Sequence, residues 1–169
     1  RLAYLLYFMP PNLYRVAAIW TELARLGFKW AASGNLRAIE LGAGPASGAC
    51  GIAAGERFTP VGIPKAGDWA LIEQDKAVLE LGSEWARTYF ADQGLPDWGT
   101  RTFHRKIDFS KPLLPPAAPR FNLWVMSYFL NEAVQSPAAL AKTLISTWEK
   151  HLDEEGLVIL VEPALKLQS

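Results

Sequence analysis

A glycine-containing turn with one acidic residue is the part of the sequence best suited to binding chemistry. It reads E-x-G-x-G, from Glu40 through Gly42, Ala43 and Gly44. Glycines let the chain turn tightly and bring backbone N–H groups against a ligand, at a helix start that carries partial positive charge. The pattern therefore predicts a loop that cradles a small ligand. The alternative is a purely structural turn in some other α/β protein.

The spacing of the glycines narrows the choice of ligand. A dinucleotide-binding turn has its third glycine three positions after the second, whereas here Gly48 follows Gly44 by four positions. Glu40 would also repel a pyrophosphate and attract a cationic amino-acid group. The turn, continued by Pro45, resembles motif I of the class I S-adenosylmethionine-dependent methyltransferases, whose loop holds the methionine and ribose parts of the cofactor. The spacing from Gly44 to Gly48 and the negative charge of Glu40 also disfavour a nucleotide-dependent oxidoreductase.

Polar and aromatic residues stand at the ends of the other expected strands, where ligands of parallel sheets bind. Glu73 ends the second strand, and an acid there can accept hydrogen bonds from both ribose hydroxyls. Asp108 is expected to end the third strand and is followed by Phe109, a pair that suits the amine and the ring of an adenine. A simple turn aspartate is an equal alternative. Ser127 and Tyr128 end the fourth strand, beneath the expected position of a transferred methyl group, although the tyrosine could serve packing alone.

No side chain is identified as a catalytic group. Cys50 lies on the helix after the glycine turn and is expected to be buried, so packing is favoured over a nucleophilic role. Neither His104 nor His151 has an acidic residue at a sequence spacing that would indicate a catalytic pair. The fourth strand is not followed by the two prolines that mark many amino-directed nucleic-acid methyltransferases. Methyl transfer can rely mainly on in-line positioning, so the absence of a base does not exclude catalysis.

Alternating helix and strand patterns must position these residues. Strands are expected at residues 36–41, 69–73, 102–107, 121–127 and 156–162, and helices at residues 12–26, 45–54, 76–90 and 136–152. This alternation predicts an α/β fold with a Rossmann-like, doubly wound parallel sheet and helices on both faces. Residues 1–35 are expected to form a helical entry segment, and residues 36–169 the cofactor-binding domain.

The N-terminal apolar run is expected to end at Pro10 and Pro11 and is too short to cross a bilayer, so no membrane association is expected. Lysine plus arginine equals aspartate plus glutamate, 17 each, which gives no general attraction to nucleic acid. A single cysteine indicates a reducing compartment and cannot build a metal site alone. The chain starts with arginine and ends just after a strand, so we expect a piece of a longer protein that continues with an antiparallel hairpin.

The order of several segments is similar to the methyltransferase-like family associated with the small ribosomal subunit in bacteria and mitochondria. These segments are YLLYFMPPNLYRVAAIWTEL, IELGAGPASG, WALIEQDKAVLELG, LWVMSYFLNEA and GLVILVEPA. The resemblance implies an S-adenosylmethionine-type fold, with the cofactor held by Gly42, Gly44, Gly48, Glu73 and residues 127–132.

The same resemblance implies a location in the bacterial cytoplasm or the mitochondrial matrix, and the small ribosomal subunit or its rRNA as partner. The protein would be either an active methyltransferase or a silent assembly factor that binds the cofactor. Mitochondrial members can carry an iron–sulfur cluster, but its clustered cysteines have no counterpart in this sequence. Basic residues at 101–111 are the local candidates for RNA contact, with a solvated surface as the alternative.

Overall fold

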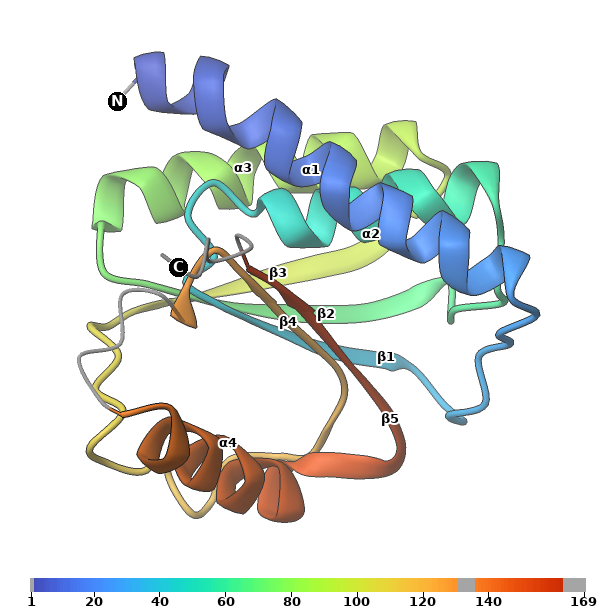
Figure 1. Cartoon of the computed structure of the whole chain (residues 1–169). Coiled ribbons are helices and arrows are strands. Elements are labelled where there is room, and N and C mark those ends of the chain that lie inside the picture. The colour runs from blue at the N-terminus through green and yellow to red at the C-terminus, as the bar shows by residue number, and fades with distance from the viewer. Residues whose placement is uncertain (1, 131–135, 163–169) are drawn as a thin grey trace, which may run out of the picture.

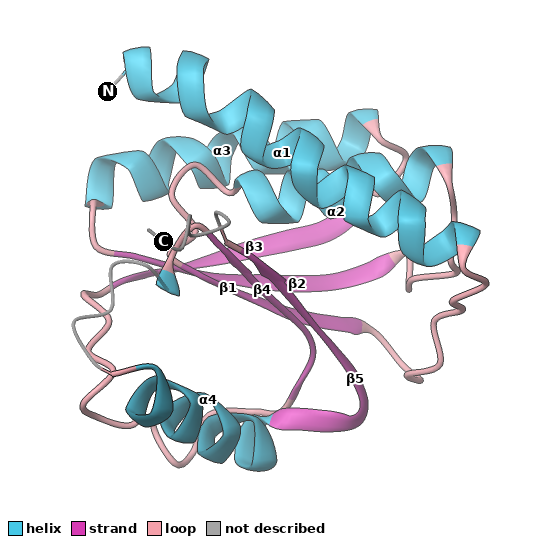
Figure 2. Ribbon diagram, in the orientation of Figure 1, coloured by secondary structure: helices cyan, strands magenta, loops and turns pink. Residues whose placement is uncertain are grey.

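The computed structural model describes residues 2–130 and 136–162 of the chain. In this part of the chain, five strands form one parallel sheet in the order β3-β2-β1-β4-β5 (Figures 1 and 2). The strands are β1 (Leu36–Leu41), β2 (Ala66–Glu73), β3 (Asp97–His104), β4 (Phe121–Ser127) and β5 (Leu152–Val161). The predicted fold class, a Rossmann-like parallel sheet, is confirmed.

Helices cover both faces of this sheet, as the alternating pattern predicted. Three helices lie on one face, α1 (Leu2–Arg25), α2 (Ser47–Phe58) and α3 (Lys76–Asp92), and α4 (Pro137–His151) lies on the other (Figure 1). Alternate residues of the central strands therefore enter two cores. In β1, Ala38 packs on the α1–α3 side, whereas Ile39 and Leu41 pack on the α4 side. Nearly continuous apolar runs are expected of strands that are buried on both faces.

The expectation that Pro10 and Pro11 end the N-terminal run is wrong, because α1 continues through both prolines. Each proline removes one backbone donor, which deprives the carbonyls of Leu6 and Tyr7 of their usual helical partners. The side chains of these two residues are 66% and 75% exposed, so water can reach this part of the helix. Asn12, expected to cap a helix, instead lies within α1.

The third strand is displaced from its predicted position, residues 102–107. β3 pairs with β2 from Ala66–Asp97 to Glu73–His104, so pairing rather than local apolar pattern fixes its ends. The buried Trp98 anchors its beginning. Asp108 therefore lies in the loop beyond β3 and not at the end of the strand. β5 likewise begins at Leu152, directly after α4, rather than at residue 156.

Small residues bring α1 into close contact with α2. A Cβ atom at Gly51 would lie 2.7 Å from the carbonyl oxygen of Leu13, and one at Gly55 would lie 2.7 Å from the side chain of Trp20. The Trp20 indole N–H donates to the buried carboxylate of Glu56 at 3.2 Å. The N-terminal half of α1 consequently extends over the carboxyl ends of the strands (Figure 1). Within the described residues, no helix is long and apolar enough to span a bilayer.

Candidate functional site

A cleft of about 1190 Å³ lies at the carboxyl ends of the strands. Its walls come from the loops after β1, β2, β3 and β4, and from α1. The strand order reverses between β1 and β4, and the crevice at such a switch point is where doubly wound sheets bind ligands. Nine of the predicted site residues line it: Gly42, Ala43, Gly44, Pro45, Glu73, Asp108, Phe109, Ser127 and Tyr128.

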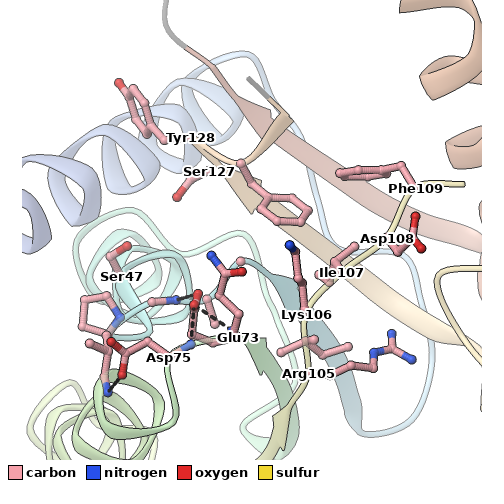
Figure 3. A pocket seen from close by; sticks show the side chains of 18 of the residues that line it. Ser47, Glu73, Asp75, Arg105, Lys106, Ile107, Asp108, Phe109, Ser127 and Tyr128 are labelled. Atoms are coloured by element: carbon pink, nitrogen blue, oxygen red, sulfur yellow. Dashed lines mark hydrogen bonds between the residues drawn. The ribbon is translucent and has the colours of Figure 1, made fainter. Parts of the chain in front are cut away.

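The glycine loop and Glu73 are directly joined at the floor of the cleft. Gly42 and Gly44 have φ angles of 65° and 50°, in the left-handed region that favours glycine. The Glu73 carboxylate accepts hydrogen bonds from the backbone N–H groups of Gly44 at 3.0 Å, Gln74 at 2.7 Å and Asp75 at 2.9 Å (Figure 3). A carboxylate has about four acceptor positions. Glu73 is therefore held in place, with capacity for a further hydrogen bond at the oxygen that faces Gly44.

Glu40 and Gly48 do not line the cleft, although both were predicted to be on the cofactor side. The Glu40 carboxylate is buried beneath the loop, where it accepts from the N–H groups of Gly48 and Ala49, both at 2.9 Å. Burial raises the pKa of Glu40 to about 8. A Cβ atom at Gly48 would lie 2.6 Å from this carboxylate, so glycine is required there for the contact. Both residues thus fix the start of α2, and Glu40 is not placed to attract a ligand in the cleft.

Asp108 both forms a turn and lines the cleft, so the two interpretations from sequence are compatible. Its carboxylate accepts from the hydroxyl of Ser110 at 2.6 Å and from its backbone N–H at 3.0 Å, and it pairs with Lys111 at 3.0 Å. The Ser110 hydroxyl, followed by Lys111, lowers the pKa of Asp108 to about 2. Next to it, the buried ring of Phe109 lies 5.3 Å from that of Phe129. This side of the cleft therefore offers a fixed anion and an aromatic wall.

The end of β4 forms a further wall of the cleft, next to Phe109. Tyr128 has a φ of 56°, unusual for a tyrosine, and its N–H donates to the carbonyl of Val161 at 2.7 Å. Such strained backbone persists where the surroundings fix it and is common at functional sites. Phe129 follows, and its ring lies so close to Gly42 that a Cβ atom there would overlap it. The part of the predicted 127–132 segment beyond residue 130 lies outside the described residues.

Several lining residues were missed or assigned elsewhere by sequence reasoning. Arg105, Lys106 and Lys111 line the cleft, although the sequence pattern associated them with an RNA-binding surface. Lys106 is directed toward the open centre of the cleft, whereas Arg105 points away from Glu73 and donates to the carbonyl of Leu113 (Figure 3).

Two kinds of chemistry find no support in the site. Cys50 is buried, which raises the pKa of its thiol well above the usual value and disfavours the reactive thiolate. No group of three histidine, cysteine or acidic side chains is placed to hold a metal ion in the part of the chain that the structure describes.

Comparison with known proteins identifies the fold but not a sequence family. No family model matches the chain, and no curated protein matches it. Among solved structures, the plantazolicin methyltransferase BpumL in complex with SAH superposes with a TM-score of 0.54 and 12% identity, covering 94% of this chain and 49% of that chain. The CcbJ methyltransferase from Streptomyces caelestis gives a TM-score of 0.52 and 17% identity, covering 89% of this chain and 52% of that chain.

These similarities define a Rossmann-like methyltransferase fold. The chain spans about half the length of these solved structures.

Proposed function

We propose that the chain binds S-adenosylmethionine in this cleft and belongs to a methyltransferase. The observation that carries the proposal is the hydrogen bond between Gly44 and Glu73, which joins the loops after β1 and β2 in the cleft at the carboxyl ends of the strands. It brings a glycine loop, suited to the methionine and ribose parts, against an acid suited to the ribose hydroxyls. The BpumL structure, which has the same fold and is in complex with SAH, supports this choice of ligand.

The remaining lining residues fit the other parts of this cofactor. Phe109 and Phe129 offer aromatic surface to the adenine, and the ionised Asp108 can accept from its amine. Ser127 and Tyr128 lie at the end of β4, on the side where the methyl acceptor would enter. When bound, the cofactor supplies an activated methyl group. The chain's own contribution is to bind, orient and exclude water, since proximity alone can supply much of the rate of a transfer.

Ligand binding can be tested by calorimetry with S-adenosylhomocysteine and by chemical unfolding. S-adenosylmethionine at 100 times its dissociation constant should stabilise the folded chain by about 2.7 kcal/mol. NADH at the same concentration should have little effect, and equal or greater stabilisation by NADH would refute the assignment.

Glu73→Ala provides the site-directed test. Charge-assisted hydrogen bonds of about 1.5–3 kcal/mol would be lost, which corresponds to roughly 10- to 150-fold weaker binding. The matched control is Glu80→Ala, because Glu80 is an exposed acid on α3 whose partner is Lys76, and it lies outside the cleft. Unchanged affinity in Glu73→Ala would place the ribose contact elsewhere.

We further propose that the target is the small ribosomal subunit, either as an rRNA methyltransferase or as a cofactor-binding assembly factor without turnover. The support is the similarity of sequence segments to the family named above, together with the exposed Arg101, whose side chain is 64% accessible. Asp68 pairs with Arg101 and Asp108 with Lys111, so much of the local positive charge is already compensated. Binding to RNA through this surface should therefore be weak and should decrease with salt.

Co-sedimentation with small-subunit precursors tests this target. The variant Arg101→Gln with Lys106→Gln should sediment less than the parent. The control, Lys142→Gln with Lys150→Gln, removes two exposed lysines of α4 and should behave like the parent. Equal sedimentation of all three forms would exclude the 101–106 surface, and no sedimentation of any form would count against the ribosomal target.

A further inference from the structure

The end of the cleft next to α1 has a positioned amide, Asn12, that the assignments above do not use, and a positioned cation, Arg15, contacts this amide. Asn12, on α1, lines the cleft. Arg15 lies one helical turn later, and its guanidinium donates to the amide oxygen of Asn12 at 3.1 Å. The same guanidinium lies over the ring of Tyr128, 5.1 Å from its centroid. Arg15 is thus held from two sides by α1 and by the end of β4.

These contacts determine which part of the Asn12 amide is available to a ligand. An amide offers one accepting oxygen and an NH₂ group with two donors. Because the oxygen faces Arg15, the two N–H donors are the groups left for the cleft. Two hydroxyls, those of Ser47 and Ser127, also line the cleft. The lining carboxylates are those of Glu73, Asp75 and Asp108, on the β2 and β3 loops. The α1 end is therefore rich in donors and suited to a negatively charged group.

Three backbone amides that could otherwise hold an anion near the glycine loop are already occupied. The N–H groups of Gly48 and Ala49, at the start of α2, are bound by Glu40, and that of Gly44 is bound by Glu73. A helix start commonly binds anions through such groups, but here acidic side chains take this role. These three amides are therefore not available to an anion in this part of the cleft, whereas α1 offers the N–H donors of Asn12.

We propose that the Asn12 amide binds the α-carboxylate of the cofactor's amino-acid part, with Arg15 orienting the amide and supplying positive charge. This inference rests on the proposed S-adenosylmethionine site. The nucleoside is assigned to Glu73 and the 105–111 loop. The glycine loop leads into α2, on which α1 packs, so we place the amino-acid part toward Asn12. The cleft, at about 1190 Å³, exceeds the roughly 300–1,000 Å³ of typical small-molecule pockets, so it has room for this arrangement.

The test compares two ligands that differ in the amino-acid part. S-adenosylhomocysteine carries the carboxylate, whereas 5′-methylthioadenosine retains the nucleoside and thioether and lacks it. Calorimetry with Asn12→Ala and Arg15→Gln should show at least about tenfold weaker binding of S-adenosylhomocysteine, which corresponds to about 1.4 kcal/mol. The affinity for 5′-methylthioadenosine should stay within about twofold.

A matched control is available on the same helix. Arg25→Gln removes an exposed arginine at the other end of α1, where it pairs with Glu22 at 2.7 Å, and it should leave both affinities unchanged. Equal weakening of both ligands in the Asn12 and Arg15 variants, or no weakening of either, would overturn the inference. If S-adenosylhomocysteine still binds and still depends on Glu73, only this inference fails. If the parent protein binds neither ligand, the proposed function fails with it.

Discussion

Replacement of Gly82 by alanine should reveal how α3 supports the glycine loop. Gly82 lies on α3 outside the cleft, and a Cβ atom there would be 2.5 Å from the Cα and carbonyl carbon of Pro45. Real Cβ atoms essentially never come within 3.0 Å of such neighbours, and the atoms met are backbone, so the helix or the loop must move. The added methyl group should therefore displace the backbone that follows Gly44.

Two opposing energies set the size of the effect. Alanine gains about 0.8–1.0 kcal/mol of helix propensity over glycine, whereas overpacking typically costs about 1–3 kcal/mol. We expect the free energy of unfolding to fall by up to about 2 kcal/mol. At about 2–4 °C per kcal/mol for a chain of this size, the melting temperature should fall by up to about 8 °C. Because a misplacement of about 1 Å in a positioned site can cost about 100-fold in function, S-adenosylhomocysteine should bind at least about tenfold more weakly.

Urea unfolding and calorimetry measure the two effects separately. Leu81→Ala is the control, because Leu81 is the preceding residue on α3 and is 46% exposed. It should change neither the affinity nor the stability by a comparable amount. A Gly82→Ala variant that is about 1 kcal/mol more stable and binds the ligand normally would show that only the higher helix propensity of alanine affects the stability. That result would refute the close contact with Pro45.

Three further predictions concern buried polar groups. Burial raises the pKa of Glu40 from 4.5 to about 8, so the folded state retains a proton that the unfolded state releases. The free energy of unfolding should therefore fall between about pH 5 and pH 8, by up to about 5 kcal/mol. Urea unfolding at a series of pH values should show a flatter pH profile for Glu40→Gln than for the parent. Parallel profiles would contradict this. Trp20→Phe removes the donor to Glu56 and should lower the free energy of unfolding by about 1.5–3 kcal/mol, whereas a loss below 0.5 kcal/mol would argue against that hydrogen bond. The thiol of Cys50 should react with a disulfide reagent only on unfolding, and rapid labelling of the native protein would be inconsistent with its burial.

The sequence was most informative where local pattern and burial agree. β1 and β4 were predicted at their observed positions, because strands buried on both faces leave short apolar runs that end at a polar or glycine residue. The residues at the ends of β1, β2 and β4 were correspondingly predicted, and they line the cleft. Glu73 is the clearest case, since the end of a buried strand fixes both its position and its direction.

The failures have a different physical cause, which is that other parts of the chain decide the outcome. β3 is an edge strand with the mixed sequence DWGTRTFH, and its limits follow from pairing with β2 rather than from its own pattern. Pro10 and Pro11 lie inside α1 because the packing of α1 on α2 stabilises a helix that local propensity would interrupt. Asn12 enters the cleft for the same reason. No local signal distinguishes Glu40 as a buried support from Glu40 as a ligand, since this depends on the direction of α2.

The strand order also has a consequence for the order of folding. β1, β2 and β3, with the helices that join them, are neighbours both in the chain and in the sheet, so contacts over short sequence distances can form this half first. β4 pairs with the other edge of β1, for example at Ala38 and Leu123, which are far apart in the sequence. Closure of so long a loop is slow relative to local contacts. We therefore expect the wall made by Ser127 and Tyr128 to meet the glycine loop only late in folding. A nascent or misfolded chain can have native helices and strands and still lack the cleft, so ligand affinity reports completion of the fold more faithfully than helical content does.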